Sequence, residues 1–186
     1  MGKLPKDAKR VFNGIIFDVF HWEQKMFDGT FQTFEMLERP DTVSVIPIDS
    51  DGKLIISNEE QPGRPAQVGL IGGRVDKGEE PIDAAKRELL EESGYIAHDF
   101  KLWIKTTPLE KVEWSTYIFI VKNIEKVQDQ ELESGEKINL FKVSFDEFVD
   151  KYVVDEDFRD FECTLEILRA KNDPEQFLKL KKQFTN

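Results

Sequence analysis

The chain has 186 residues, a length that suits one domain of about 150 residues with an appended segment. Hydrophobic residues make up 39% of it and charged residues 34%, which is typical of a globular protein that builds its own core. The formal net charge is −11, from 26 basic and 37 acidic residues. This acidic balance argues against nucleic-acid binding and against a basic membrane-binding patch.

Cysteine and histidine are scarce, which limits the kinds of site that the chain can build. The single cysteine, Cys163, excludes an intrachain disulfide framework and a cysteine-rich zinc site, and we expect it to be a buried thiol. His21 and His98 lie far apart in the sequence, so a histidine metal centre is not expected. No apolar run approaches the roughly 20 residues of a membrane span, and the polar N-terminus lacks a signal-peptide core. We therefore expect a cytoplasmic protein.

The first part of the chain is predicted to be an appended strand pair. Alternating apolar residues indicate one strand over residues 11–20 and another over residues 31–37. The Asp-Gly pair at residues 28–29 favours a hairpin turn between them. The pattern breaks at residues 39–41, which defines two parts. These are an N-terminal strand extension, residues 1–40, and a main domain, residues 41–186.

The main domain is predicted to contain strands, one central helix, and then further strands and helices. The central helix begins at Pro81 and ends before Gly94, because proline suits a first helical turn and glycine a helix stop. A loop is expected over residues 59–67. The expected strands cover residues 41–48, 53–57, 102–104, 114–121 and 138–143. Three C-terminal helices are indicated by the capping box Ser144–Glu147, by the apolar residues Phe158, Phe161, Leu165 and Leu168, and by Phe177, Leu180 and Phe184. This order predicts an α+β protein with a layered α/β/α arrangement.

Three glutamates of the central helix form the most informative pattern. Glu88, Glu91 and Glu92 are spaced so that a helix places them on one face, where like charges repel. Carboxylate oxygens are the ligands that Mg²⁺ and Mn²⁺ prefer, and such an ion would let an acidic protein hold a phosphate group. Taken alone, the same three residues are also typical of a solvated acidic helix surface.

The surrounding residues resemble the Nudix box, G-x5-E-x7-R-E-U-x-E-E-x-G-U, in which U is a bulky aliphatic residue. The matching positions are Gly73, Glu79, Arg87, Glu88, Leu89, Glu91, Glu92 and Gly94, with Tyr95 at the last position. Eight matches at fixed spacing make this a specific motif. The resemblance implies the Nudix fold, an α/β/α sandwich with a mixed sheet.

The resemblance also implies a role for each residue of the box. Glu88, Glu91 and Glu92 would bind Mg²⁺, or Mn²⁺ in its place, helped by the carbonyl of Gly72, and Glu91 would also take part in catalysis. The Glu79–Arg87 pair would brace the loop against the helix, and Asp76 would be a turn residue. The reaction would be attack of water on a diphosphate phosphorus, helped by the metal.

Residues on both sides of the box resemble the ADP-ribose and nucleoside-diphosphate-sugar pyrophosphatase branch of the family. Residues 35–47 lead into the first core strand, and residues 69–79 lead into the helix. This branch carries an N-terminal strand pair that builds a homodimer, for which residues 11–39 have the right size and alternation. The resemblance therefore implies a homodimeric hydrolase that converts ADP-ribose, or a related nucleoside diphosphate sugar, to a nucleoside monophosphate and a sugar phosphate.

Side chains outside the box are candidates for the general base and for substrate binding. The branch takes its base from a late mobile loop, here residues 129–137, so that Glu133 is the first candidate and Glu136 the second. Each of these glutamates is otherwise typical of a solvated loop. Trp22 is a candidate for stacking on the base across a dimer, and Phe27 a weaker one, with a hydrophobic core as the other interpretation for both. The candidate phosphate or ribose contacts are Arg39, Arg64 and Arg74, each of which is otherwise a surface charge.

Two other functions remain alternatives. One is hydrolysis of oxidised nucleoside triphosphates, which typically occurs on a shorter chain without the extra strands. The other is a nucleotide-sensing module that has lost catalysis, which an intact set of three glutamates disfavours. In each case the expected partner is a small nucleotide, without nucleic acid or membrane.

Overall fold

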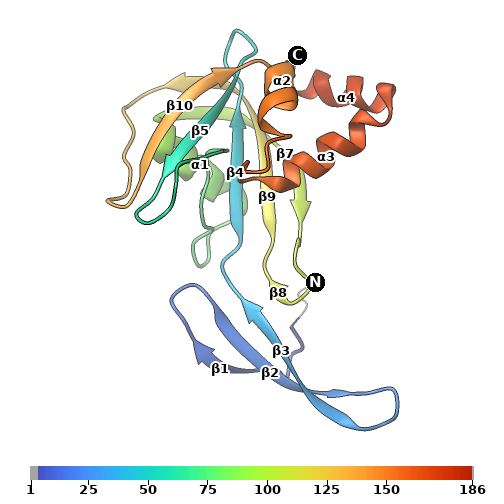
Figure 1. Ribbon diagram of the computed structural model, residues 1–186. Coiled ribbons are helices and arrows are strands. Elements are labelled where there is room, and N and C mark those ends of the chain that lie inside the picture. Colours follow the sequence, from blue (N-terminus) through green and yellow to red (C-terminus); the bar gives the residue numbers. More distant parts are fainter. Residues whose placement is uncertain (1–3, 186) are drawn as a thin grey trace.

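The computed structural model describes residues 4–185, and its strands form three sheets (Figure 1). The N-terminal sheet contains, in spatial order, β1 (Lys9–Asn13), β2 (Asp18–Lys25), β3 (Phe31–Glu38) and β8 (Val112–Glu113). The second sheet contains β10 (Lys137–Val143), β5 (Leu54–Glu60) and β6 (Gln67–Gly69). The third contains β4 (Thr42–Pro47), β9 (Thr116–Lys126) and β7 (Tyr95–Thr106). Strand β4 pairs with β9 in parallel, whereas β7 pairs with β9 in antiparallel orientation, so the third sheet is mixed.

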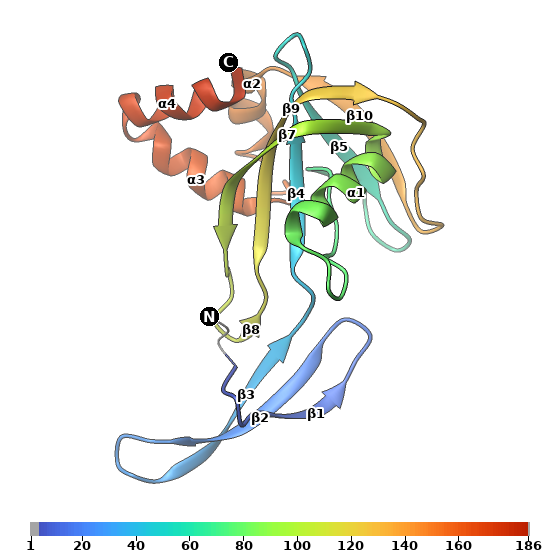
Figure 2. The ribbon, with the colours of Figure 1, turned by 180° about the vertical axis from the view of Figure 1, so that it is seen from behind.

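Helices cover both faces of the third sheet (Figures 1 and 2). On one face, Val43 and Val45 of β4 pack with Leu89 of α1 (Pro81–Ser93). On the other face, Ile46 and Ile48 join a larger core built with the C-terminal helices. Alternate residues of one strand thus belong to two cores, which confirms the predicted α+β fold with an α/β/α sandwich.

Helix α1 begins and ends where the sequence predicts. Pro81 occupies the first turn, and Gly94 ends the helix at a φ of 67°, with its N–H donating to the Leu90 carbonyl at 2.7 Å. Its buried apolar residues, Ala84, Ala85 and Leu89, pack against the sheet, and Glu88 and Glu92 are buried beside them.

The prediction of one strand over residues 11–20 is wrong, because the chain turns between β1 and β2. At Gly14 a side-chain Cβ would lie 2.2 Å from the Phe17 carbonyl oxygen, so only glycine fits this turn. The Asp18 carboxylate also accepts a hydrogen bond from the Gly14 N–H at 3.2 Å. The apolar alternation continues across this turn, so the sequence pattern does not reveal that the strand is interrupted.

Several strands are longer than predicted because polar residues extend their pairing. Strand β5 continues through Glu60, which pairs with Lys137 of β10, so the expected loop begins only after this residue. Strand β7 begins at Tyr95, directly after the helix, and this residue pairs with Lys126 of β9. The strand predicted over residues 102–104 is therefore only the centre of β7.

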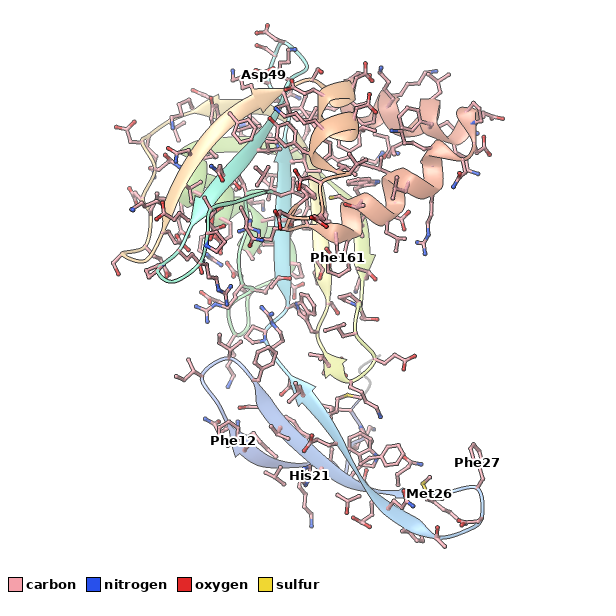
Figure 3. The ribbon with its side chains drawn as sticks, viewed as in Figure 1. Phe12, His21, Met26, Phe27, Asp49 and Phe161 are labelled. Atoms are coloured by element: carbon pink, nitrogen blue, oxygen red, sulfur yellow. The ribbon has the colours of Figure 1, made fainter. Side chains whose placement is uncertain are left out.

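The C-terminal helices are α2 (Phe145–Glu147), a π-helical turn η1 (Phe148–Tyr152), α3 (Phe161–Lys171) and α4 (Pro174–Thr185). The Ser144 hydroxyl accepts a hydrogen bond from the Glu147 N–H, as the capping box predicts. In α3 the buried residues include Cys163 and Ile167, whereas the predicted apolar residues Phe161, Leu165 and Leu168 are about half exposed. Phe158, the first residue of the predicted stripe, is buried but precedes the helix, and Phe161, the first residue of α3, is labelled in Figure 3. Among the described residues, no helix combines the length and the apolar character that crossing a bilayer requires.

Candidate active site

The three glutamates of α1 share the helix face that lies beside residues 70–73. Glu88 and Glu92 are 9% and 5% exposed, whereas Glu91 is only half-buried. A carboxylate loses its hydration on burial, so two of them on one helix face require compensating groups. The predicted spacing on one face is confirmed.

Arg87 supplies part of this compensation. Its guanidinium donates to Glu79 at 3.0 and 3.1 Å, to Glu88 at 2.7 Å and to Glu91 at 3.1 Å. It also donates to the Arg74 carbonyl at 2.9 Å, which fixes the loop before the helix. These carboxylates raise the pKa of Arg87, led by the hydrogen bond to Glu79. The predicted Glu79–Arg87 pair is thus present, as part of a larger network.

The loop before the helix makes the turn that the sequence predicts at Asp76. The Glu79 N–H donates to the Asp76 carbonyl at 3.0 Å, and the Asp76 N–H donates to the Glu79 carboxylate at 3.0 Å. Glu79 therefore links the loop backbone to Arg87 of the helix.

Two glycines bring the backbone against the carboxylates. The Gly72 N–H donates to Glu92 at 2.9 Å, and a Cβ at Gly72 would lie 2.1 Å from the Val43 carbonyl oxygen. A Cβ at Gly73 would lie 2.4 Å from an oxygen of Glu88. The Gly72 carbonyl accepts no hydrogen bond from the described part of the chain, so its oxygen is available to a cation.

Burial of the two carboxylates raises their pKa values. The pKa of Glu92 is raised to about 8, mainly by desolvation. The hydrogen bond from the Gly72 N–H lowers this pKa, whereas the charges of Glu88, Glu136 and Asp160 raise it. Desolvation also raises the pKa of Glu88. A cation at this face would replace the lost hydration of both groups.

The donor set of this face fits a hard divalent cation. Each of the three carboxylates of α1 has one oxygen without a hydrogen-bond partner among the described residues, and the Gly72 carbonyl has none. Within residues 4–185, however, no three His, Cys, Asp or Glu side chains are gathered closely enough to hold a metal ion as they stand. Glu88 and Glu91 each give their other oxygen to Arg87, so a cation at this face would compete with that guanidinium for the two carboxylates.

The face of α1 that carries Glu88, Glu91 and Glu92 is called the acidic face. Of the two predicted base candidates, Glu136 is the one whose charge acts on this face. Its charge contributes to raising the pKa of both Glu88 and Glu92, and its side chain is half-buried. Glu133 is exposed. The loop that carries both is tied to α1 because the Gln130 amide donates to the Glu92 carbonyl at 2.6 Å.

The predicted substrate residue Arg39 lies at the junction of the two parts of the chain. Its guanidinium stacks on the rings of Phe17 and Trp114, at 5.6 and 4.8 Å, and its buried Nε has no hydrogen-bond partner in the described structure. It lines a cavity of about 730 Å³, together with Val75 and Lys77 of the box loop. This cavity connects the box loop with the N-terminal sheet.

The other predicted contacts are more dispersed. Arg74 is exposed on the box loop, and Arg64 lines a small cavity of about 120 Å³ beside Arg159. Trp22 lies in the N-terminal sheet, where its ring packs edge-on against Phe34 at 5.8 Å. Within one chain, strand β2, which carries Trp22, lies away from α1 (Figures 1 and 2). Phe27 is fully exposed at the hairpin turn, so a core role for it within one chain is wrong (Figure 3).

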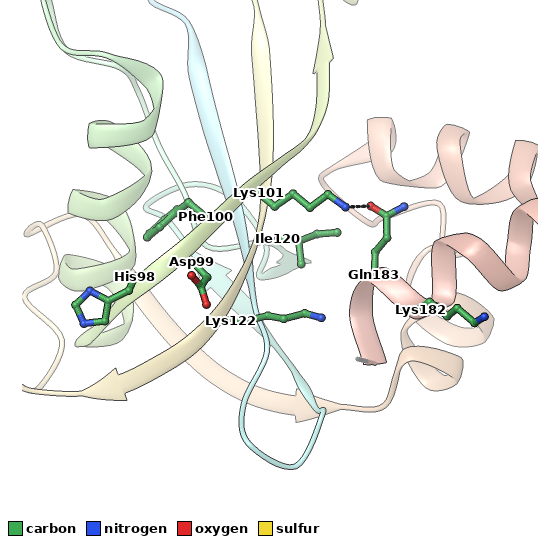
Figure 4. A pocket seen from close by; sticks show the side chains of 8 residues that line it. All are labelled: His98, Asp99, Phe100, Lys101, Ile120, Lys122, Lys182 and Gln183. Atoms are coloured by element: carbon green, nitrogen blue, oxygen red, sulfur yellow. Dashed lines mark hydrogen bonds between the residues drawn. The ribbon is translucent and has the colours of Figure 1, made fainter.

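A further cavity, of about 500 Å³, lies between the β7–β9 pair and α4 (Figure 4). Lys101 and Lys122 of the strands and Lys182 of α4 line it, and Lys101 donates to the Gln183 side chain at 3.0 Å. None of its lining residues belongs to the box, so it is separate from the acidic face.

Sequence reasoning missed Arg159 and Asp160, whose side chains contact the segment that leads into the box. The Asp160 carboxylate accepts a hydrogen bond from the Leu70 N–H, ninety residues away in the sequence. In the sequence, both residues fall among the apolar positions of the helix predicted from Phe158 onward, so they carried no signal of their own. The partner of the Asp160 side chain, Leu70, cannot be identified from the sequence around Asp160.

Comparison with known proteins agrees with this geometry. The family model described as NUDIX domain matches residues 38–162. The chain is 25% identical over 142 residues to the ADP-ribose pyrophosphatase of Bacillus subtilis (strain 168), covering 75% of this chain and 77% of that protein. It is also 25% identical over 154 residues to the methanol dehydrogenase activator of Bacillus methanolicus, covering 79% of this chain and 83% of that protein.

A solved structure described as an ADP compounds hydrolase shares the fold. It superposes with a TM-score of 0.72 at 22% sequence identity, covering 90% of this chain and 91% of that one. The sequence relative thus confirms the predicted resemblance to the ADP-ribose pyrophosphatase branch, and the solved structure shows the same fold. Because the family model spans the acidic helix, its bracing loop and the strands that hold them, the chain belongs to the Nudix family and is a Nudix hydrolase.

Proposed function

We propose that this chain is a Mg²⁺-dependent hydrolase that cleaves the diphosphate of ADP-ribose or a related nucleoside diphosphate sugar. Its products would be a nucleoside monophosphate and a sugar phosphate. The observation that carries the proposal is the face of α1, where three carboxylates with free oxygens lie beside the unpartnered Gly72 carbonyl. The relatives named for ADP-ribose and for ADP compounds support this substrate class.

The metal would be held by Glu88, Glu91, Glu92 and the carbonyl of Gly72. When bound, it supplies charge neutralisation on the diphosphate and eases deprotonation of a water molecule. Mn²⁺ is a suitable substitute because it takes the same oxygen ligands. Arg87 would keep its contacts to Glu79 when Glu88 and Glu91 turn to the ion, so the loop stays braced.

For the general base, we favour Glu136 over Glu133, which the sequence ranked first. Glu136 is half-buried and its charge acts on Glu88 and Glu92, whereas Glu133 is exposed. Its carboxylate would accept the proton of the attacking water when the loop closes over the diphosphate. Arg39, Arg64 and Arg74 would contact phosphate or ribose oxygens, and Arg39 is already held between two rings.

A substrate panel tests the proposal. The purified chain is incubated with Mg²⁺ and ADP-ribose, other nucleoside diphosphate sugars, or 8-oxo-dGTP, and phosphate is measured after coupling to a phosphatase. We expect release from ADP-ribose or a nucleotide sugar, which a metal chelator abolishes. Faster turnover of 8-oxo-dGTP would instead identify a housecleaning hydrolase. Nucleotide binding without turnover of any compound would identify a sensing module.

We also propose that residues 1–40 form a separate extension that joins two chains into a homodimer. Its sheet exposes large apolar side chains, which a second copy would cover. Those that are more than half exposed are Val11, Phe12, Ile15, Phe27 and Phe31. Phe12 and Phe27 are labelled in Figure 3. Such pairing would bring Trp22 of one chain toward the diphosphate site of the other, where its ring would stack on the base.

A further inference from the structure

Asp160 is a buried carboxylate whose hydrogen bonds lead toward the box. It is 8% exposed, and its two oxygens accept from the Ser44 hydroxyl and from the Leu70 N–H, each at 2.8 Å. It stands at the N-cap position of α3, yet its side chain caps no N–H of that helix. An aspartate at this position usually accepts a hydrogen bond from a backbone N–H of the helix. Here the carboxylate instead binds Ser44 and Leu70, which lie outside the helix.

Arg159 holds the other side of the same peptide segment. Its guanidinium donates to the Leu70 carbonyl and forms an ion pair with Glu59, and its backbone N–H donates to the Val68 carbonyl at 3.0 Å. A Cβ at Gly69 would lie 2.9 Å from atoms of both Arg159 and Asp160. Both the N–H and the C=O of Leu70 are therefore fixed by the segment that enters α3.

The fixed residue lies two positions before the proposed metal ligand. After Leu70, the Ile71 carbonyl accepts from Val45 at 2.7 Å and the Gly73 carbonyl accepts from Val43 at 2.9 Å. The carbonyls on either side of Gly72 thus accept hydrogen bonds from β4, whereas the Gly72 carbonyl accepts none from the described residues and the Gly72 N–H donates to Glu92. Because glycine adopts many backbone conformations, the orientation of this carbonyl depends on its anchored neighbours.

We propose that Asp160 is a positioning residue for the metal site: it anchors the Leu70 N–H and thereby orients the Gly72 carbonyl toward the carboxylates of α1. This inference rests on the proposed metal-dependent function. It links the C-terminal helical layer to the box through one buried hydrogen-bonded side chain. Partners that orient a ligand without touching the metal commonly change metal affinity by about 10–100-fold.

The test compares two substitutions of Asp160 in the full-length chain. D160A removes both anchors, whereas D160N keeps them, because an amide accepts from Leu70 through its oxygen and donates to the Ser44 hydroxyl through its nitrogen. Mn²⁺ affinity is measured without substrate, from the electron paramagnetic resonance signal of the free ion. We expect D160A to weaken Mn²⁺ binding by about 10-fold or more and D160N to stay within about threefold of the parent.

T116V is the matched control for general destabilisation. The Thr116 hydroxyl is buried and donates to Glu162 of α3 at 3.3 Å, so this variant also removes a buried link to α3. It does not touch residues 70–73, and we expect parental Mn²⁺ affinity. Equal weakening in T116V and D160A would overturn the proposal, as would equal weakening in D160N and D160A.

S44A keeps the test valid if D160A does not fold. It removes one partner of Asp160 and leaves the Leu70 hydrogen bond in place, so a smaller loss of Mn²⁺ affinity is expected, of about threefold. Parental affinity in every folded variant would overturn the positioning role.

A parent chain that binds Mn²⁺ but does not hydrolyse ADP-ribose would overturn the proposed substrate alone. The D160A and D160N comparison would still decide the positioning role. A parent that binds no Mn²⁺ would overturn both proposals.

Discussion

At the scale of single residues, Arg87 acts as the counter-charge of the acidic face. Its guanidinium contacts Glu79, Glu88 and Glu91, two of which are proposed metal ligands. A divalent cation at the proposed site would therefore compete with this guanidinium for the carboxylates of Glu88 and Glu91. Without the ion, the guanidinium offsets the repulsion among the glutamates of the helix.

The first prediction at this scale concerns E92Q. Glutamine keeps the shape of the side chain and its oxygen still accepts from the Gly72 N–H, so the fold should survive. It removes a charged ligand, and we expect hydrolysis of ADP-ribose at saturating Mg²⁺ to fall by at least about 10-fold. Thermal unfolding and steady-state rates are the measurements.

The control for this variant is E175Q on α4, a glutamate-to-glutamine change at an exposed residue paired only with Lys179. It should leave the rate unchanged. Parental turnover by E92Q would show that Glu92 is not a metal ligand.

The second prediction concerns the pH dependence of stability through Glu162. Burial raises its pKa above the ordinary value of 4.5, and Asp160 acts in the same direction. The folded chain therefore holds this proton to higher pH than the unfolded chain does, so stability falls as pH rises from 4.5 through the folded pKa. E162Q removes this contribution.

Urea unfolding at about pH 5 and about pH 8 measures the effect. We expect the parent to lose more stability between these two conditions than E162Q does. Identical losses would show that Glu162 does not ionise differently in the folded and unfolded chains.

At the scale of elements, the segment from Leu70 to Gly73 depends on close backbone approach. A methyl group at Gly72 would meet the Val43 carbonyl at 2.1 Å, and its φ is 152°. We expect G72A to displace the segment from α1, with a lower melting temperature and weaker Mn²⁺ binding. Thermal unfolding and Mn²⁺ titration check this.

G78A is the control, because Gly78 also has a positive φ, of 86°, but a Cβ there meets nothing within 4 Å. Backbone strain alone should lower the free energy of unfolding of G78A by about 1 kcal/mol, without loss of Mn²⁺ affinity. Equal behaviour of the two variants would mean that the close contact at Gly72 has no special effect.

Elements with strong local signals were predictable and elements defined by pairing were not. Helix α1 carries its own start and stop residues, Pro81 and Gly94, so its bounds follow from the sequence. Strand β7 extends to Tyr95 because β9 lies beside it, and its first three residues, Tyr95 to Ala97, are consecutive apolar residues that show no alternation. The exposed stripe of α3 shows the same limit, since tertiary packing selected the other face of that helix.

At the scale of the whole molecule, the N-terminal sheet and the sandwich use apolar residues differently. The sandwich buries them in two cores, whereas the N-terminal sheet leaves Phe12, Ile15 and Phe27 exposed. A small sheet without a covered face is marginal in water, so a second copy is the natural cover.

We therefore predict a solution mass of twice the 21.7 kDa of one chain, measured by light scattering at micromolar concentration. Deleting residues 1–39 should give a monomer and abolish hydrolysis, because Trp22 would no longer reach the partner's site. L178D is the control, an apolar-to-charged change at an exposed residue of α4, and should stay dimeric. A monomeric parent chain would exclude the shared role of Trp22.

The predictable part of the site is the part that is local in the chain. The box runs only from Gly73 to Tyr95, so fixed spacing and helical geometry suffice to place its three helical glutamates on one face. The contacts of Asp160 with Ser44 and Leu70 join residues that are 116 and 90 positions apart. No local pattern encodes such a contact, because it exists only once the layers have packed.

The long reach of the Asp160 hydrogen bonds also bears on how the protein is made. A ribosome synthesises the whole box well before it reaches Asp160, so the nascent chain exposes the three glutamates while Leu70 is still unanchored. The loop entropy of closing a contact over ninety residues must be overcome before this anchor forms. Folding of the proposed metal site is therefore expected to complete late, after the C-terminal helices have emerged, so that an unfinished chain does not yet carry a finished hydrolase.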